Sequence, residues 1–488
     1  MIHRGLPPRG MPAPEVLERL EQYRAHDVDW RAGKLWAYVF DPGHEAEQLI
    51  KQAYMAYLSE NGLDPTAFPS LARLENEVVA LAIGHLRGDA AVVGNFTSGG
   101  TESCMLAVKA ARDWARSRRP ELYTRKPKIV LPTTAHAAFH KAAAYLDLEV
   151  VAVDVDPDTY KANVAAMADA IDEDTIMLVG SAVSYAHCVV DPIEELAAVA
   201  MERGLWLHVD ACMGGFLLPY FRRLGREVPD FDFAVSGVSS ISMDLHKYAF
   251  AAKGASVVLY RDRELRRHQL FVCANWTGYT MANTTIQSSK SGGPIAAAWA
   301  ILHHLGDAGY LQLAASVLDA TERVINFVDA HPDLRLLGTP DMNHVAIASD
   351  TMSIFRIADA INARGWFMQV QLSYRNSPAN MHICINPANL PVLDKLLADI
   401  RDAIEDARDA KPNPTIAQLR PMLALIDIAR LDGATLRGMM QMAGLKPGGG
   451  GAINADINEL FDTLPPAARA RVVAEFMNEL FVPPKASE

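Results

Sequence analysis

The chain has 488 residues, enough for one large hydrophobic core and a second, smaller one. Half of the residues are hydrophobic, 21% are charged and the net charge is −12, so nucleic acid and anionic membranes are poor partners. Charged residues interrupt every long apolar run, which excludes an integral membrane segment. Five scattered cysteines without a C-x-x-C pair argue against a disulfide framework. We therefore expect a cytoplasmic protein of two domains with additional end segments.

The first 60 residues predict an arm rather than a domain of their own. A Pro/Gly-rich leader at 5–12 precedes a helical pattern at 14–26, and an aromatic stretch follows at 33–40. Such a leader rarely builds a core alone, so we expect the arm to lie on another surface, such as that of a partner subunit.

Residues 61–330 predict a large α/β domain. A helical pattern at 69–86 is followed by short apolar strands at 128–132, 149–153, 176–180 and 205–211, which alternate with helical segments. This alternation with short connections indicates parallel strands joined by right-handed helical crossovers. A strand that ends before Lys247 and an edge strand at 256–260 complete the expected sheet.

A smaller α+β domain is expected at 331–410, after helical segments at 294–304 and 310–330. Strand-like segments occur at 334–337, 345–348, 352–355 and 381–385, with helices from Ile357 and Leu390. From Lys411 a Pro-punctuated linker leads to a helical tail, 411–488, in which the four glycines at 448–451 predict a flexible loop.

Three separated elements carry the chemistry. Lys247 follows an apolar strand, and a buried lysine can act as a nucleophile or form an imine. Asp210 ends another buried strand, where α/β folds bind their ligands. The small residues at 97–103 precede a helix, whose N-terminal N–H groups favour a phosphate. Together these elements indicate pyridoxal 5'-phosphate, with the aspartate keeping the pyridine nitrogen protonated.

Histidines and lysines near these elements are further candidates. His136 opens a helix and could stack its ring on the cofactor, although with His140 it also forms an H-x-x-x-H pair typical of zinc sites. No third ligand is evident, so we expect no metal. His246 could donate to the cofactor phosphate, and Lys253 could bind an anionic substrate or remain a surface charge.

These motifs resemble the group II pyridoxal-phosphate-dependent decarboxylase family. The resemblance rests on the segments 97–103, 136–139, 191–196, 208–211 and 246–254. Within the family the chain is most similar to the sphingosine-1-phosphate lyase subfamily, because of Phe68–Leu71, the Ser/Gly segment at 288–293, Gly365-Trp366 and His382–Cys384. This resemblance implies fold type I, with a mostly parallel seven-stranded sheet, and a homodimer whose active sites lie between the subunits.

The resemblance also implies roles for individual residues. Lys247 would bond covalently to the cofactor, Asp210 would pair with the ring nitrogen and His136 would stack on the ring. The complete set expected at the cofactor is Ser98, Gly99, Gly100, Thr101, His136, His208, Asp210, His246, Lys247, Ser288 and Ser289, the two serines coming from the neighbouring subunit. The catalytic set is Lys247, Asp210, His136, His187 and Tyr38, and the substrate set is Lys253, Phe40 and Arg375.

The implied reaction is retro-aldol cleavage of a phosphorylated long-chain β-hydroxyamine to a fatty aldehyde and phosphoethanolamine, with His187, Tyr38 or Lys247 as the base. The segment 288–293 departs from the lyase pattern Gly-Ser-Arg-Pro-Gly-Gly, and Arg375 adds a cation where lyases are mostly apolar. Amino-acid decarboxylation on the same cofactor is therefore the alternative. A catalytically silent scaffold is a third possible function, but the presence of both Lys247 and Asp210 argues against it. Eukaryotic lyases carry an N-terminal membrane anchor, which we do not expect here.

Overall fold

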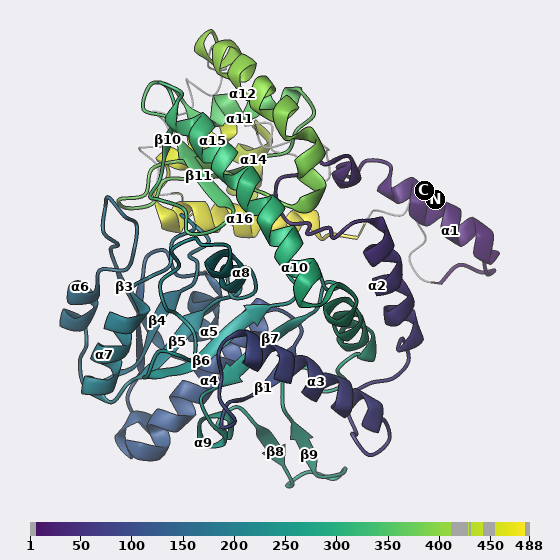
Figure 1. Cartoon of the computed structure of the whole chain (residues 1–488), viewed down its shortest axis with the longest axis vertical. Coiled ribbons are helices and arrows are strands. Elements are labelled where there is room, and N and C mark those ends of the chain that lie inside the picture. Colours follow the sequence, from purple (N-terminus) through teal and green to yellow (C-terminus); the bar gives the residue numbers. More distant parts are fainter. Residues whose placement is uncertain (1–5, 411–427, 429–430, 443–453, 484–488) are drawn as a thin grey trace.

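The computed structural model describes residues 6–410, 428, 431–442 and 454–483 (Figure 1). The expected linker from Lys411 and the expected glycine loop at 448–451 lie outside these residues. The described chain consists of a large domain around a central sheet, a smaller domain above it, an N-terminal arm and a group of C-terminal helices.

Seven strands form the central sheet in the order β1-β7-β6-β5-β4-β2-β3. They are β1 (Val93–Thr97), β2 (Lys128–Pro132), β3 (Glu149–Val153), β4 (Thr175–Ser181), β5 (Trp206–Asp210), β6 (Val238–Asp244) and β7 (Ser256–Tyr260). Only β7 runs antiparallel to its neighbours. The expectation that β7 is an edge strand is wrong, because β1 pairs with it from Val93↔Tyr260 to Thr97↔Ser256. The sequence did not reveal β1 as a strand, because Gly94 and Asn95 interrupt its apolar run.

Helices cover both faces of this sheet, which explains why strands such as β2 carry apolar residues on both faces. In β2, Ile129 and Leu131 pack on one face and Val130 on the other. The first face carries α4 (Gly100–Arg118) and α5 (Ala138–Leu146). The second carries α3 (Pro69–His85), α7 (Ile193–Arg203), α8 (Leu218–Arg223) and α10 (Gly292–Asp329), with the short α6 (Val164–Asp169). Remaining short elements are η2 (Pro120–Tyr123), α9 (Arg263–Arg266) and the hairpin β8 (Phe271–Cys273) and β9 (Met281–Asn283).

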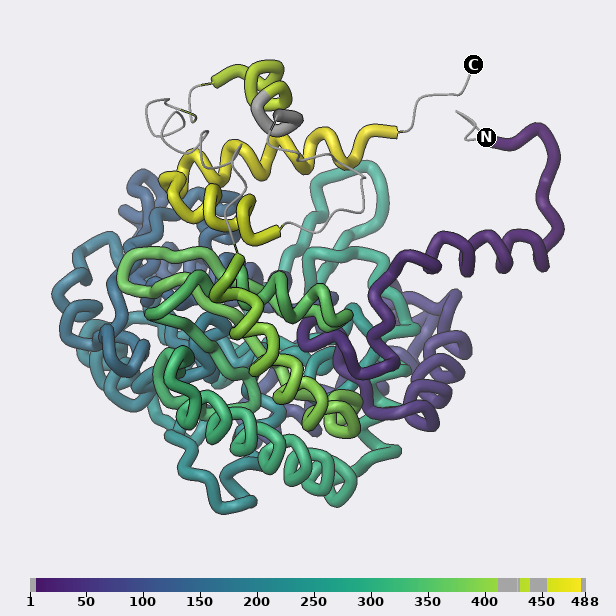
Figure 2. Tube along the Cα trace, turned by 90° about the horizontal axis from the view of Figure 1, so that it is seen from above, coloured from purple at the N-terminus to yellow at the C-terminus, as the bar shows by residue number. Residues whose placement is uncertain are grey.

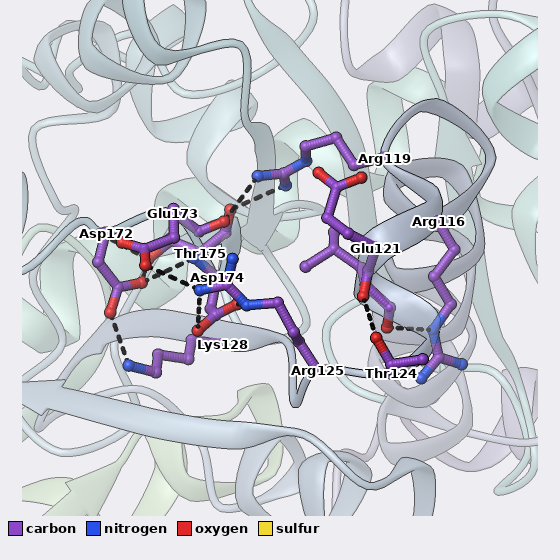
Figure 3. Close-up of polar contacts among 11 residues, drawn as sticks. Arg116, Arg119, Glu121, Thr124, Arg125, Lys128, Asp172, Glu173, Asp174 and Thr175 are labelled. Carbon is purple, nitrogen blue, oxygen red and sulfur yellow. Dashed lines mark hydrogen bonds and ion pairs between the residues drawn. The ribbon is translucent and has the colours of Figure 1, made fainter.

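Ion pairs tie the beginnings of β2 and β4 together at the edge where these parallel strands start (Figure 3). Lys128 Nζ lies 2.6 Å from Asp172 Oδ2, and Arg125 pairs with both Glu173 and Asp174. Arg119 donates to the carbonyl oxygens of Glu173 and Thr175. Most of these side chains are exposed, so each pair adds at most about 1 kcal/mol, and their effect is to hold the register of the two strands. The opposite edge, where the strands end, remains available for a site.

The N-terminal region is extended and touches the small domain through one segment. Helix α1 (Ala13–Arg24) projects from the body and buries none of its side chains (Figures 1 and 2). After η1 (Trp30–Ala32), Leu35 forms a parallel bridge with Phe367, and Trp36 is fully buried. Helix α2 (His44–Ala56) then packs against α10. The segment 36–40 is thereby held between the two domains.

The small domain has an antiparallel sheet in the order β10-β11-β13-β12, covered by α11 (Ile354–Ala363) and α12 (Leu393–Arg408). Its strands are β10 (Arg335–Leu336), β11 (His344–Ala348), β12 (Gln369–Gln371) and β13 (Asn380–Cys384), and η3 (Pro387–Val392) precedes α12. The strand expected at 352–355 is wrong: α11 starts at Ile354, because its apolar residues Ile354, Phe355, Ile357, Ala358 and Ile361 form one buried helical face. Helix α10 leads into this domain and is interrupted at Gly306, where φ is 56°.

Three described C-terminal helices lie beside the small domain: α14 (Gly433–Met442), α15 (Ala455–Thr463) and α16 (Pro466–Leu480) (Figure 2). Arg356 of α11 pairs with Asp456 and Glu459 of α15, each at 2.8 Å. Asp462 accepts hydrogen bonds from the backbone and hydroxyl of Ser373, so α15 is also tied to the loop before β13. Within the described part of the chain, no helix is both long and apolar enough to cross a membrane.

Candidate active site

A cavity of about 610 Å³ lies where strands β1, β4, β5 and β6 end, closed by the small domain and by the segment 36–40. Its position follows from the topology, because the carboxyl ends of parallel strands meet at one edge of the sheet. Among the expected site residues, the structure brings a large subset to its lining: Tyr38, Phe40, Ser98, Gly99, Gly100, Thr101, His136, Asp210, His246, Lys247 and Lys253.

The turn from β1 into α4 forms a cradle of backbone groups. Glu102 shapes this turn, since its Oε2 accepts from Ser98 N at 2.6 Å and its Oε1 accepts from Ile286 N at 2.9 Å. A Cβ at Gly100 would lie 2.9 Å from both carboxylate oxygens of Asp244 and from Cys212 Sγ, so only glycine fits. The unpaired N–H groups at the start of this long helix favour an anion. The cradle therefore suits a phosphate group.

Lys247 lies in the turn after β6 and pairs with a carboxylate that the sequence analysis did not consider. Its Nζ is 2.9 Å from Oδ2 of Asp244, the last residue of β6. Burial alone would lower the pKa of Lys247, but the acidic groups that face its amine, Asp244 foremost, together raise that pKa above the usual value. His246 Nδ1 accepts from Ala255 N at 3.4 Å, which leaves its Nε2 to carry a proton and donate. Burial lowers the pKa of His246, so the ring is neutral near pH 7.

Asp210 is positioned by a buried relay of hydrogen bonds that runs behind the cavity. Its Oδ1 accepts from Cys212 N at 3.1 Å and from Ser242 Oγ at 3.3 Å. Ser242 Oγ also contacts Nε2 of His208 at 3.2 Å, whose Nδ1 lies 2.8 Å from Ser240 Oγ. Burial lowers the pKa of His208 to about 4, so this ring is neutral and can donate at one nitrogen while accepting at the other. His208 thus stands behind Asp210 and does not line the cavity.

His136 projects into the cavity from the loop that follows β2. Its Nδ1 accepts from Ala138 N at 3.1 Å, which fixes the ring at the start of α5. His140, its possible zinc partner, does not line the cavity. Among the described residues, the one cluster with suitable spacing for a metal is Cys104, Asp210 and Cys212, and neither histidine belongs to it.

The mouth of the cavity combines a lysine with two aromatic residues. Lys253 Nζ donates to the carbonyl oxygens of Tyr38 at 2.9 Å and His246 at 3.3 Å, and it lies 4.8 Å from the centre of the Phe40 ring. Although much of Lys253 is exposed, burial of its amine, together with the charge of Lys247, lowers the pKa to about 8. Burial also raises the pKa of Tyr38, which makes its phenol a weak candidate for a base.

Two expected residues lie outside the lining of the cavity. His187 is fully buried, stacks on Tyr160 at 4.1 Å and contacts Ser377 Oγ through Nε2 at 2.9 Å. Arg375 pairs with Asp154 at 2.9 Å and donates to Ala152 O, so its guanidinium is directed to β3 and the loop behind it. Neither position was evident from the sequence, because both partners belong to distant segments. Their roles at a substrate stay predictions.

Ser288 and Ser289 also lie outside this cavity, next to the hairpin β8–β9. Ser288 lines a separate pocket with Lys290, whose amine pairs with Glu75 at 2.6 Å. Their expected contribution to the site of a neighbouring subunit is a prediction.

The small domain, together with Tyr185 of the large domain, contributes a polar wall that the sequence analysis missed. Tyr185 donates its hydroxyl to Gln369, and His344 and His382 pack edge to face with ring centres 4.3 Å apart. These four residues and Cys384 line the cavity. His382 and Cys384 stood out only as a subfamily motif, and nothing in the local sequence of the other three marks a site. Those of the small domain converge because β11, β12 and β13 lie side by side, and Tyr185 reaches them from the loop after β4 of the large domain.

Comparisons with known proteins agree with this geometry. The pyridoxal-dependent decarboxylase conserved domain matches residues 15–348, and a C-terminal HTH domain of pyridoxal-dependent enzymes matches residues 417–479. The chain belongs to the pyridoxal-dependent decarboxylase family. It is a pyridoxal-phosphate-dependent lyase of fold type I.

Three relatives of this lyase, from a plant, a bacterium and an archaeon, show the range of similarity. The sphingosine-1-phosphate lyase of Arabidopsis thaliana is 39% identical over 425 residues, covering 86% of this chain and 76% of that protein. The solved structure of the Burkholderia pseudomallei sphingosine-1-phosphate lyase is 34% identical with a TM-score of 0.79, covering 87% of this chain and 96% of that chain. A protein of Pyrococcus furiosus named "Probable L-aspartate decarboxylase" is 32% identical, covering 75% of this chain and 95% of that protein.

The residues around the cavity fit pyridoxal 5'-phosphate. The cradle at Gly100 has no room for a side chain and offers backbone donors to a phosphate. Asp210 is held by hydrogen bonds to its Oδ1, and Lys247 supplies an amine to the same cavity. Anion donors, a carboxylate and a lysine are the groups that this cofactor requires.

Proposed function

We propose that this lyase cleaves the Cα–Cβ bond of a phosphorylated long-chain β-hydroxyamine, releasing a fatty aldehyde and phosphoethanolamine. The observation that supports this most is the similarity to sphingosine-1-phosphate lyases over more than four fifths of the chain. The cavity agrees with such a substrate, because it places one lysine beside the cofactor site and a second at the mouth. On one substrate molecule, the primary amine would replace the lysine at the cofactor site, and the phosphate would bind the lysine at the mouth.

The cofactor, once bound, supplies an electron sink for the bond that breaks. We propose that Ser98, Gly99, Gly100, Thr101 and His246 hold its phosphate, that Asp210 faces its ring nitrogen, supported by His208, and that His136 lies against its ring. Lys253 would bind the phosphate of the substrate, with Phe40 beside it.

Two proton transfers complete the cleavage. A base takes the proton from the β-hydroxyl as the Cα–Cβ bond breaks, and an acid returns one proton to Cα, so the products balance the substrate. Lys247 and Tyr38 line the cavity, whereas His187 does not. We assign both transfers to Lys247, because its amine is released in the cavity as a neutral base when the substrate amine replaces it, whereas the phenol of Tyr38, with its raised pKa, must first ionise.

We also propose a homodimer with active sites between subunits. The hairpin β8–β9 and its turn expose Phe271, Val272 and Tyr279, and α1 exposes Leu17 and Tyr23, so both projections have apolar surface that a second copy could cover. Mixing Lys247→Ala subunits with subunits in which Ser288 and Ser289 are both alanine tests this arrangement. Partial recovery of activity in the mixture is expected, and no recovery despite subunit exchange would contradict shared sites.

Amino-acid decarboxylation remains the competing activity, supported by the relative named as an aspartate decarboxylase. The position of Arg375 disfavours it, since this guanidinium is paired with Asp154 and lies outside the lining of the cavity. Purified enzyme should therefore release aldehyde from a phosphorylated β-hydroxyamine and no carbon dioxide from a panel of amino acids. Carbon dioxide release without aldehyde would reverse the assignment.

We further propose the domain division 1–60, 61–330, 331–410 and 411–488 and a cytoplasmic location. The N-terminal arm, the central sheet, the small sheet and the C-terminal helices support the four parts. The five cysteines are all unpaired thiols, which suits a reducing compartment.

A further inference from the structure

The cavity contains a second carboxylate, Asp244, beside Asp210. Asp244 closes strand β6, its side chain is 3% exposed and its backbone pairs with Ser256 of β7. Its Oδ1 is buried without a hydrogen-bond partner among the described residues, and its Oδ2 lies 2.9 Å from Lys247 Nζ. The position of this carboxylate is set by the sheet, whereas Lys247 lies in the turn that follows.

A buried carboxylate is costly unless a cation or hydrogen bonds compensate it. His246 Nε2 is the next basic nitrogen, 3.6 Å from Asp244 Oδ2, but that ring is neutral near pH 7. The ammonium of Lys247 is therefore the main compensation for Asp244. Asp210 differs, because backbone and hydroxyl donors already serve its Oδ1.

We propose that Asp244 is the positioning residue of Lys247: it holds the amine as an ion pair whenever Lys247 is protonated and carries no covalent bond, and it leaves Asp210 free for the cofactor ring. The reaction needs such a partner, since a substrate amine must displace Lys247 and later be displaced by it. The proposal depends on the proposed function only in taking Lys247 as the cofactor-binding lysine.

The balance of charges around Lys247 predicts what the loss of Asp244 would do. The groups that face its amine are Asp244, Asp210, Cys212, Tyr185, His246, Lys253, His344 and Cys384. Of these, Asp244 is the strongest influence that favours the ammonium, while burial opposes it. Asp244→Asn therefore shifts Lys247 towards the neutral amine at a given pH, and Asp244→Glu retains the ammonium.

The chemical reactivity of Lys247 tests this directly in the full-length enzyme. Hydroxylamine removes the cofactor, and trinitrobenzenesulfonate then labels the free lysine at a series of pH values, with peptide mass spectrometry to read Lys247 alone. We expect Asp244→Asn to react about tenfold faster than wild type or more at neutral pH, since one pKa unit is a tenfold change in neutral amine. Asp244→Glu should follow wild type, and Asp210→Asn should change the rate less than Asp244→Asn.

A second measurement does not rely on labelling. Pyridoxal 5'-phosphate is added back, and borohydride traps the fraction that has bonded to Lys247 over time. We expect Asp244→Asn to form this bond faster at neutral pH but to retain it less well against a competing amine, because the displaced lysine is no longer held. Unchanged labelling and trapping in a folded Asp244→Asn protein, or a larger effect of Asp210→Asn, would overturn the proposal. These outcomes are independent of which substrate the enzyme cleaves.

Discussion

The amine of Lys253 lies 2.9 Å from the carbonyl oxygen of Tyr38, 215 residues earlier in the chain. This contact brings the N-terminal segment 36–40 to the mouth of the cavity, beside the turn that carries Lys247, where Phe40 packs on the ring of Tyr248 at 4.9 Å. It also turns the Lys253 amine inward, where burial lowers its pKa.

The pKa of Lys253, about 8, predicts a pH dependence for substrate capture. Below this pH the amine is an ammonium and attracts the substrate phosphate, and above it the charge is lost. We expect kcat/KM for the phosphorylated substrate to fall as the pH rises through about 8, because this ratio reports the free enzyme. Lys253→Arg keeps its charge and should lack this fall, whereas Lys253→Met should be impaired at every pH. A fall of equal size in the arginine variant would refute the assignment.

Lys247→Ala should abolish turnover and leave the fold largely intact. The side chain lines the cavity and supports little packing, so its loss removes the covalent attachment of the cofactor without opening a hole in the core. Borohydride should no longer fix cofactor to the protein, while circular dichroism stays near that of wild type and the melting temperature falls, because the buried Asp244 loses its cation. In the control variant Lys253→Met, which removes the other lysine of the same cavity, borohydride should still fix the cofactor to Lys247.

Gly100→Ala should weaken cofactor binding by about tenfold or more. The added Cβ would approach both oxygens of Asp244 and Cys212 Sγ to 2.9 Å, so the cradle must distort before a phosphate can enter. Equilibrium titration with pyridoxal 5'-phosphate measures the change. Gly84→Ala in α3 is the matched control, because a Cβ there meets nothing within 4 Å. Equal affinity in the two variants would show that the cradle tolerates a side chain.

Ser242→Ala should reduce cofactor affinity as well as stability. It removes one of the donors to Asp210 and leaves Nε2 of His208 buried without its partner. Loss of a buried hydrogen-bond partner costs about 1–3 kcal/mol, which urea denaturation can measure. Ser240→Ala is the control: it deprives Trp206 and His208 of a partner but does not touch Asp210. It should lose similar stability and keep more of the affinity for the cofactor.

Much of the large domain could be predicted from local patterns. The strands at 128–132, 149–153 and 256–260 appear in the structure with those bounds, because runs of apolar residues leave a clear signal, whether the strand is buried as in β2 and β7 or partly exposed as in the edge strand β3. Strand β1 was missed and β7 was placed at the edge, since Gly94 and Asn95 mask β1. In the small domain, the sequence predicted a strand at 352–355, where α11 begins. A segment of only four residues is too short for its apolar pattern to distinguish a strand from the first turn of a helix.

The sequence alone determined the family, the cofactor and the residues that lie in contiguous motifs, because short-range order places a glycine turn, a strand-end aspartate and a lysine at the same edge of a parallel sheet. Tertiary structure decided which groups meet across that edge. It paired Lys247 with Asp244 rather than Asp210, put His208 behind Asp210, turned Arg375 to Asp154 and brought Tyr185, Gln369 and His344 into the wall. The Lys247–Asp244 pair is local, three residues apart, and the turn after β6 sets its geometry. The other contacts join different strands and loops, and those of Gln369 and His344 depend on how the two domains pack, which no local pattern encodes.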